Sequence, residues 1–301
     1  MTTITDAKLS RTSLSYVALR TPDVQAMAQF YADAMGLAAP PGGPDGSRGS
    51  DAPDGLRLGW GSGHYALELL PGAPALDHFG LEIADAGGHH AVGERLERQG
   101  VEVRQLDPRA ETLQVRDPDG NAVHLHGRVS RAGEHAADTG RRPVRIQHVT
   151  LATADLQPMI DFYLALGFRL TDRMGGVFAW LRSNVEHHSL AIVDTGVSGG
   201  LDHYSFDLDS WDDFKVWADR LTDRGIQVQW GPGRHGPGNN LFLFFDDLDG
   251  NHIELSAEME RFFDGYADYA PRIWNADPTT VNLWGGQVPR WRDGTHETPA
   301  S

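Results

Sequence analysis

Apolar and polar residues alternate with a period of two in several short segments, a pattern typical of β-strands with one buried face. Three such segments lie in the second half of the chain, at residues 146–153, 201–208 and 251–256. Their less apolar faces carry His148, His203 and Glu254, one on each predicted strand. Two imidazoles and one carboxylate that leave neighbouring positions open form the facial triad of non-haem Fe(II) sites. The pattern therefore predicts a metal site, although a single histidine on a strand usually just belongs to a polar layer.

The same arrangement of elements recurs four times along the chain. Each time a predicted strand runs into an amphipathic helix, and a glycine ends the helix before the next apolar strand. These glycines are Gly36, Gly100, Gly167 and Gly225. They lie 19 to 22 residues after Tyr16, His78, His148 and His203, respectively. Glycine supplies the left-handed residue that satisfies the last carbonyls of a helix, so its regular recurrence predicts a repeated structural unit.

Two similar turns, Asp117–Asn121 and Asp247–Asn251, precede the last predicted strand of each half. Turns that contain Asp-Gly favour β-hairpins. Together with the repeat, they predict an α+β fold that consists of tandem duplicated βαβββ modules, two in each half of the chain.

The two halves differ at the positions where chemistry would occur. The first half has Tyr16, His78 and His124 where the second half has the three candidate ligands. Only two of these three residues are ordinary ligands for divalent metals, and none is a carboxylate. We therefore expect a decayed site in the first half and a working site in the second, and a second metal ion in the first half is the less favoured alternative.

With these motifs, residues 12–285 resemble the type I extradiol catechol dioxygenases of the vicinal oxygen chelate superfamily. The resemblance implies two domains, each a curved mixed sheet around a cavity, at residues 11–128 and 144–260, with a tail at residues 261–292 that folds over the site. It implies Fe(II), less often Mn(II), held by His148, His203 and Glu254. The implied substrates are a catechol and O2, the ring is cut beside the hydroxyl pair, and the enzyme is a homo-oligomer.

The resemblance also assigns roles to residues around the metal. His188 matches the family's acid/base histidine, while the preceding His187 is expected on the opposite strand face, pointing outward. His235, in a Gly-rich loop, matches the histidine that contacts the substrate hydroxyl or bound oxygen, unless it is simply an exposed loop residue. Asn239 in the same loop is a candidate substrate contact. Trp180 matches a tryptophan of the pocket wall, although core packing would explain it equally well.

Two departures from the family affect the expected substrate. Phe244 stands ten residues before Glu254, where the family usually has a tyrosine whose hydroxyl contacts the catechol. Losing a positioned donor of this kind can cost about 10²–10³ in rate. The homoprotocatechuate branch has arginines at positions that Trp230 and the pair Thr279–Thr280 occupy here. A neutral or larger aromatic catechol is therefore expected in place of a carboxylated one.

Composition excludes several other classes of protein. A length of 301 residues suits two domains of about 130 residues each. The net charge of −16 repels nucleic acid and anionic membrane surfaces. The chain has no apolar run near the length of a membrane span, and no basic start followed by an apolar signal core. The absence of cysteine fits a cytoplasmic enzyme.

Two other functions remain open at this point. The first is a non-oxidative member of the same superfamily, an isomerase, lyase or resistance transferase that uses the metal as a Lewis acid; Phe244 is its best support. The second is a metal-free protein that binds a ligand between the repeats, but such a protein would be expected to lack the triad. Little order is expected at residues 1–10, 38–55 and 129–143 and after residue 292, whereas the aromatic segment 262–284 is expected to fold back.

Overall fold

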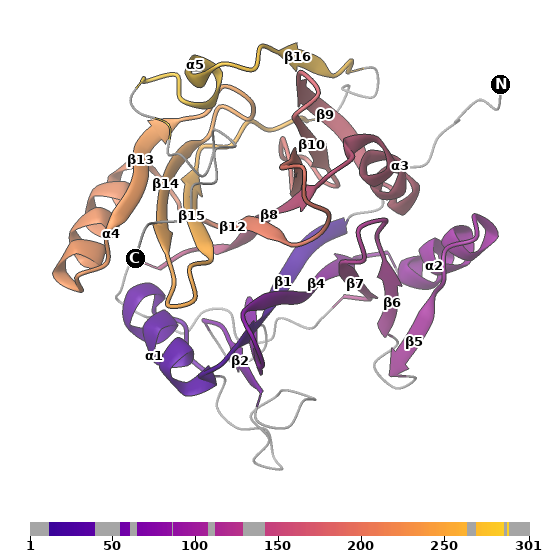
Figure 1. Cartoon of the computed structure of the whole chain (residues 1–301), viewed down its shortest axis with the longest axis horizontal. Helices are drawn as coiled ribbons and strands as arrows, with labels where there is room; N and C mark the ends of the chain where they lie inside the picture. Colours follow the sequence, from indigo (N-terminus) through magenta and orange to yellow (C-terminus); the bar gives the residue numbers. More distant parts are fainter. Residues whose placement is uncertain are drawn as a thin grey trace.

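The structure is a computed structural model, in which two β-sheets form the framework of the described part of the chain (Figure 1). The segments expected to have little order lie outside the described part, apart from residues 38, 39, 55, 142 and 143. Among the described residues, no helix combines the length and apolar character needed to cross a membrane. The described residues are 12–39, 55–60, 65–85, 87–107, 112–128, 142–263, 269–285 and 288.

The first half forms a seven-stranded mixed sheet in the order β2-β3-β1-β4-β7-β6-β5. The central strands β1 and β4 are antiparallel, and each has a parallel neighbour on its outer side, β3 and β7 respectively. The elements of this half are β1 (Thr12–Thr21), α1 (Val24–Met35), β2 (Leu56–Leu58), β3 (Leu67–Pro71), β4 (Ala75–Ile83), α2 (Gly88–Arg98), β5 (Arg104–Asp107), β6 (Thr112–Arg116) and β7 (Ala122–His126).

The second half repeats this plan in a nine-stranded sheet, in the order β13-β14-β15-β12-β8-β11-β10-β9-β16. Its central strands β8 and β12 are again antiparallel, with parallel neighbours β11 and β15. The elements are β8 (Arg145–Thr153), α3 (Leu156–Leu166), β9 (Arg169–Met174), β10 (Phe178–Arg182), β11 (Leu190–Asp194), β12 (Leu201–Asp207), α4 (Trp211–Asp223), β13 (Val228–Arg234), β14 (Leu241–Asp246), β15 (His252–Ala257), β16 (Arg272–Trp274) and α5 (Pro278–Val281).

This architecture confirms the predicted α+β fold of tandem modules. Three modules are complete βαβββ units. In the first module, the described residues form only a bridge between Ala38 and Gly59 where the other modules have a strand after the helix. The four glycines that close the helices all have positive φ, between 68° and 105°. The predicted helix ends are therefore correct.

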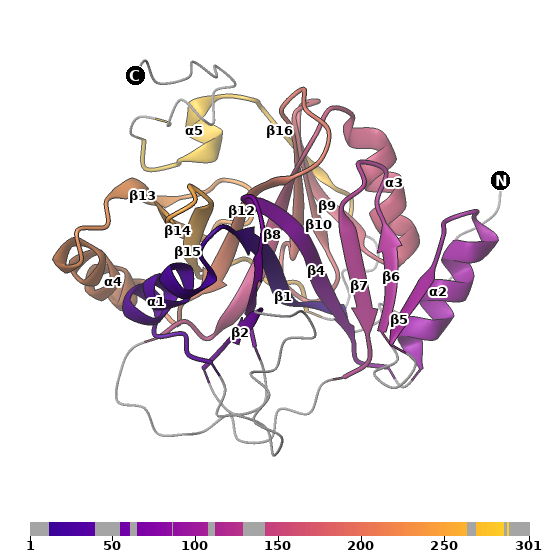
Figure 2. The ribbon, with the colours of Figure 1, turned by 60° about the horizontal axis from the view of Figure 1, so that its bottom comes forward.

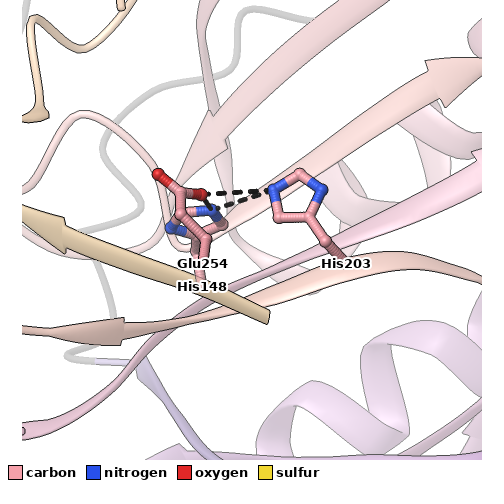
Figure 3. Close-up of side chains that lie close together, drawn as sticks. All are labelled: His148, His203 and Glu254. Carbon is pink, nitrogen blue, oxygen red and sulfur yellow. Dashed lines mark hydrogen bonds and ion pairs between the residues drawn. The ribbon is translucent and has the colours of Figure 1, made fainter. Parts of the chain in front are cut away.

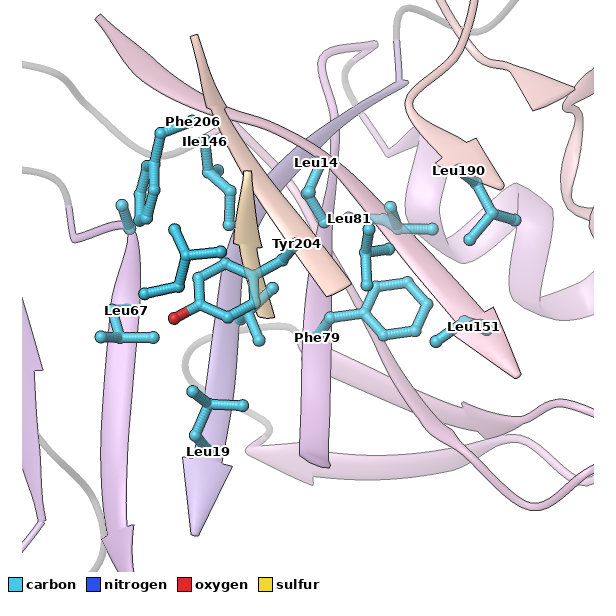
Figure 4. Packing of buried hydrophobic residues seen from close by; sticks show 14 of the residues in the cluster. Leu14, Leu19, Leu67, Phe79, Leu81, Ile146, Leu151, Leu190, Tyr204 and Phe206 are labelled. Carbon is cyan, nitrogen blue, oxygen red and sulfur yellow. The ribbon is translucent and has the colours of Figure 1, made fainter. Parts of the chain in front are cut away.

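The back faces of the two sheets pack against each other and form one shared core (Figure 4). Alternation along β8 sends Val149 and Leu151 into this core and leaves His148 and Thr150 on the opposite face. The core thus determines which face of the second sheet can hold a polar site. Labelled members of the core are Leu14, Leu19, Leu67, Phe79 and Leu81 from the first half and Ile146, Leu151, Leu190, Tyr204 and Phe206 from the second.

A symmetric pair of hydrogen bonds also joins the halves. The Tyr31 hydroxyl in α1 donates to Oδ2 of Asp247 at 2.7 Å, and the Tyr163 hydroxyl in α3 donates to Oδ2 of Asp117 at 2.9 Å. Both carboxylates lie in the predicted Asp-Gly turns, and burial raises the pKa of each tyrosine, which keeps its hydroxyl protonated. The turns therefore fasten each half to a helix of the other.

Candidate metal centre and substrate pocket

Three neighbouring strands bring the candidate ligands together. His148 on β8, His203 on β12 and Glu254 on β15 are all buried and point to one spot on the face opposite the shared core (Figure 3). Nε2 of His148 lies 2.9 Å from Oε2 of Glu254 and 3.3 Å from Nε2 of His203. Register explains this convergence, because Ser205 on the middle strand faces His148 on one side and Glu254 on the other.

The donor set fits a divalent metal ion. One atom from each of the three residues lies within 4.8 Å of the other two, and no other group of three His, Cys, Asp or Glu does so among the residues that the structure describes. Nδ1 of His203 donates to Oδ1 of Asp202 at 2.5 Å, and Nδ1 of His148 donates to Oε1 of Gln147 at 3.1 Å. With the proton on Nδ1, each neutral ring offers the Nε2 lone pair that a metal needs.

The electrostatics of the three residues also suit a cation. Burial lowers the pKa of His148, although the nearby Glu254 partly opposes that effect. Burial alone would raise the pKa of Glu254, but the adjacent His148 and His203 outweigh burial and hold that pKa well below its usual range. The carboxylate is thus ionised, as metal binding requires.

The equivalent position in the first half is arranged differently. The Tyr16 hydroxyl lies 3.1 Å from Nδ1 of His124. On the other side of the same ring, Nε2 of Gln114 lies 3.1 Å from Nε2 of His124. The His78 ring stacks on His124 with a centroid distance of 3.7 Å. Burial, together with the nearby His78, lowers the pKa of His124 to about 3. Both nitrogens of His124 thus face neighbouring side chains, which favours the decayed-site interpretation.

His188 lies beside the candidate metal centre, with its ring centroid 4.4 Å from that of His148. Behind it, Nε2 of His187 donates to Oδ2 of Asp172 at 2.9 Å. This leaves Nδ1 of the neutral His187 ring as the acceptor for Nδ1–H of His188, at 3.0 Å. The chain of contacts therefore puts the acceptor lone pair of neutral His188 on Nε2.

The prediction that His187 points outward is wrong. Its side chain is completely buried. The period-two rule fails here because residues 183–189 leave the regular strand and form the connection between β10 and β11. The backbone N–H of His187 instead donates to the carbonyl of Glu260 at 2.8 Å, which turns the side chain inward.

The C-terminal segment, residues 269–285, crosses the open side of the second sheet (Figure 2). At one edge β16 pairs with β9, and at the other the N–H of Leu283 donates to the carbonyl of Arg234 at the end of β13. Asp172 on β9 holds the segment further by accepting from Trp274 Nε1 at 2.7 Å and from Arg272 Nε at 3.0 Å. Hydrogen bonds from His187 and Arg272 outweigh the effect of burial and lower the pKa of Asp172 to about 2. One ionised carboxylate thus supports both the segment and the histidine pair.

This segment also determines the orientation of His235. Nδ1 of His235 donates to the carbonyl of Val281 at 2.6 Å, so in the neutral ring Nε2 is the acceptor. Nε2 lies 3.8 Å from Oε1 of Glu254, inside the pocket. His235 is only half-buried, yet it belongs to the pocket lining and is more than an exposed loop residue.

The candidate ligands line a pocket of roughly 450 Å³, part of which is open to solvent. Trp180 is part of its wall, stacked on Phe178 with ring centroids 4.4 Å apart. Phe244 is fully buried, with its ring edge-on to His203 and stacked on Trp230. The lining consists of His148, Thr150, Phe178, Trp180, His188, His203, Trp230, His235, Pro237, Glu254 and Val281.

The structure does not bring Asn239 into this pocket. Its side chain is exposed, and the residue is absent from the lining. The next residue, Asn240, is fully buried and donates to Glu254, a role that the sequence did not reveal. Asp202 and Asp172 were also missed. Asp202 had a visible signal, because the Leu-Asp-His string around it recurs at residues 76–78 of the first half.

The chain resembles proteins of one superfamily over most of its length. The family model described as "Glyoxalase/Bleomycin resistance protein/Dioxygenase superfamily" matches residues 13–125 and again residues 145–255. An iron-dependent extradiol dioxygenase from Rhodococcus jostii is 28% identical over 92% of this chain and 97% of its own length. A manganese-dependent 2,3-dihydroxybiphenyl 1,2-dioxygenase from Geobacillus genomosp. 3 is 25% identical, over 90% of this chain and 92% of its own length.

Among solved structures, the Mn(II)-bound glyoxalase from Novosphingobium aromaticivorans superimposes with a TM-score of 0.78. It is 28% identical, and the match covers 91% of this chain and 90% of the glyoxalase. These three proteins are therefore named for different activities, two as dioxygenases and one as a glyoxalase. The names give iron for the Rhodococcus protein and manganese for the other two.

Proposed function

Because the chain belongs to the glyoxalase/bleomycin resistance protein/dioxygenase superfamily, we propose that it is an extradiol ring-cleaving dioxygenase acting on a catechol-type substrate. One observation carries the proposal. The His148–His203–Glu254 centre shares its pocket with two further histidines, His188 and His235, whose Nδ1 atoms are both engaged by hydrogen bonds. A buried metal centre with two adjacent acid/base groups suits a reaction that removes protons from a diol and later returns one.

We propose that His148, His203 and Glu254 hold one Fe(II) ion, with Mn(II) as the alternative. When bound, the metal supplies the electron transfer that allows O2 to react with an aromatic diol. Asp202 and Gln147 keep the two imidazoles in the tautomer that presents Nε2 to the metal.

His188 is the proposed base. In its neutral form it offers Nε2 to a catechol hydroxyl, because its Nδ1 proton is directed to His187. When Nε2 takes the proton, Nδ1–H still donates to His187, whose ring is held by the ionised Asp172. Burial and the neighbouring histidines lower the pKa of His188, so the proton is readily given up again. The same nitrogen can return the proton later in the reaction.

His235 is the proposed hydrogen-bonding partner of the second reacting oxygen. Its Nδ1–H is fixed on the carbonyl of Val281, so Nε2 accepts a proton or a hydrogen bond in the pocket. Because Val281 belongs to the segment that crosses the pocket, the position of this histidine depends on that segment.

The pocket wall favours a substrate with an uncharged side chain. Phe178, Trp180, Trp230, Pro237 and Val281 give an apolar wall, and none of the lining residues within the described part of the chain is Arg or Lys. Without a cation, a substrate carboxylate would lose its hydration and gain no charged partner in exchange. We therefore propose a neutral, substituted aromatic catechol as the substrate.

We also propose that the enzyme is a cytoplasmic homo-oligomer that binds neither nucleic acid nor membranes. The net charge of −16 disfavours anionic partners, and the lack of cysteine fits a reducing compartment.

Oxygen uptake tests the proposed function directly. Protein reconstituted anaerobically with Fe(II) should consume one O2 per catechol and form a coloured ring-opened product. Uncharged substituted catechols should give a higher kcat/KM than catechols that carry a carboxylate, for the reason given above. An oxygen electrode measures the oxygen consumed and the rates, and absorbance spectra detect the coloured product. No uptake across a broad panel, together with a metal-dependent isomerisation or addition, would establish a non-oxidative enzyme instead.

That non-oxidative alternative rests on two observations, the absence of a hydroxyl at Phe244 and the similarity to a protein named as a Mn(II)-bound glyoxalase. His188 and His235 argue for ring cleavage. A metal-free binding protein is disfavoured, because all three members of the triad are present and converge.

Phe244→Tyr tests whether the missing hydroxyl limits turnover or makes room for a bulky substrate. Phe244 faces Glu254 across the β14–β15 pair, so the new hydroxyl is added on the face of the sheet that holds the metal centre. We expect kcat for small catechols to be unchanged or raised, by at most the roughly 10²–10³ that one positioned donor contributes. Turnover of a bulky substrate should fall. Steady-state oxygen uptake measures both effects.

Phe245→Tyr is the matched control. It adds the same hydroxyl on the opposite face of β14, in the shared core, and should lower thermal stability without changing the kinetics. A large loss of turnover for every catechol in Phe244→Tyr would show that the phenyl ring itself is required.

A further inference from the structure

The two carboxylate oxygens of Glu254 have different neighbours. Oε2 faces the imidazoles, at 2.9 Å from Nε2 of His148 and 3.4 Å from Nε2 of His203. Oε1 accepts a hydrogen bond from Nδ2 of Asn240 at 3.1 Å and lies 3.8 Å from Nε2 of His235. A carboxylate can bind a metal through one oxygen or through both. The amide of Asn240 engages one of the two and leaves Oε2 turned toward the candidate metal position.

The amide of Asn240 is itself held in place. Its Nδ2 also donates to Oγ of Ser256 at 2.9 Å, and the side chain is completely buried. Ser256 lies two residues after Glu254 on β15, so both acceptors stand on the same face of one strand. Two acceptors on a rigid strand therefore restrict the rotation of the amide, and with it the rotation of the carboxylate.

The backbone of Asn240 supports the proposed catalytic loop. Its carbonyl accepts from the N–H of His235 at 2.9 Å and closes the loop of residues 235–240. The carbonyl of Gly238 accepts from the N–H of Glu260 at 2.8 Å, which ties the loop to the chain beyond β15. One residue thus joins the loop that carries His235 to the carboxylate of the metal centre.

We propose that Asn240 is a positioning residue that holds Glu254 as a single-oxygen ligand and so sets the affinity of the centre for its metal. This inference rests on the metal centre of the proposed function and does not depend on the reaction catalysed there. Hydrogen-bond partners of metal ligands typically contribute 10- to 100-fold to metal affinity. Asn240→Ala should weaken metal binding to that extent.

The experiment uses the full chain, stripped of metal by a chelator and titrated with Mn(II) under anaerobic conditions. The electron paramagnetic resonance signal of free Mn(II) gives the dissociation constant. Asn240→Ala is expected to raise that constant about 10- to 100-fold. Asn239→Gly is the matched control, because it removes an exposed amide at a residue whose positive φ of 50° suits glycine. It should bind Mn(II) within about twofold of the unaltered protein, since its side chain does not contact Glu254.

A second readout separates positioning from general destabilisation. The spectrum of bound Mn(II) reports the symmetry of its ligands, so it should change in Asn240→Ala at saturating metal and remain unchanged in Asn239→Gly. If Asn240→Ala does not fold, Asn240→Ser gives the same test, because its shorter side chain keeps a polar group but cannot span to Oε1.

Unaltered affinity and an unaltered spectrum in the folded variant would overturn the role of Asn240. That outcome leaves the proposed function intact. Conversely, Mn(II) binding that depends on Asn240 in a protein that consumes no O2 would support Asn240 and refute the dioxygenase.

Discussion

Glu254→Ala should yield a folded protein that retains essentially no metal and cleaves no catechol. Glu254 is the single carboxylate of the candidate centre, and its ionised form balances the charge of the metal. Without Glu254, only two neutral imidazoles remain. The attraction between a buried dication and an anionic ligand, which stabilises the bound metal, is then lost. Metal content should fall from one ion per chain to near zero. Plasma mass spectrometry after desalting measures it, with circular dichroism as the check of folding.

His124→Ala is the control for this experiment. His124 occupies the equivalent position in the first half, where its two nitrogens face Tyr16 and Gln114. This variant should keep a full complement of metal and its oxygen uptake. Full metal content in Glu254→Ala, or loss of metal in His124→Ala, would refute the assignment of the centre to the second half.

Removing either pocket histidine should have the second largest effect. His188→Ala and His235→Ala should each lower kcat and kcat/KM together by about 10²–10⁴, the usual contribution of a positioned acid/base group. The loss should be large because no tyrosine hydroxyl stands at Phe244 to share the task. Both variants should keep their metal, since neither histidine belongs to the triad. Oxygen uptake at saturating and limiting catechol separates kcat from kcat/KM.

His252→Ala provides a comparison on the same sheet. His252 lies on β15 next to Asp246 and is not part of the pocket lining, and its removal should change kcat by less than about twofold. Rates close to those of the unaltered protein in both His188→Ala and His235→Ala would show that neither histidine acts on the substrate.

The sequence by itself determined the repeated architecture and the members of the candidate centre. Both depend on local rules. Alternation of period two placed His148, His203 and Glu254 on one face of their strands, and the core that formed on the opposite face bears this out. Glycines after the helices and Asp-Gly turns before the last strands marked the modules, because these conformations strongly favour particular residues.

Contacts between distant parts of the chain were decided only by the tertiary structure. His187 turns inward because a carbonyl of residue 260 and the carboxylate of Asp172 hold it, and neither is its neighbour in sequence. Asn240, in place of Asn239, reaches the site because the loop closes through the N–H of His235. Such contacts follow from packing between segments, and periodicity along one segment carries no information about them.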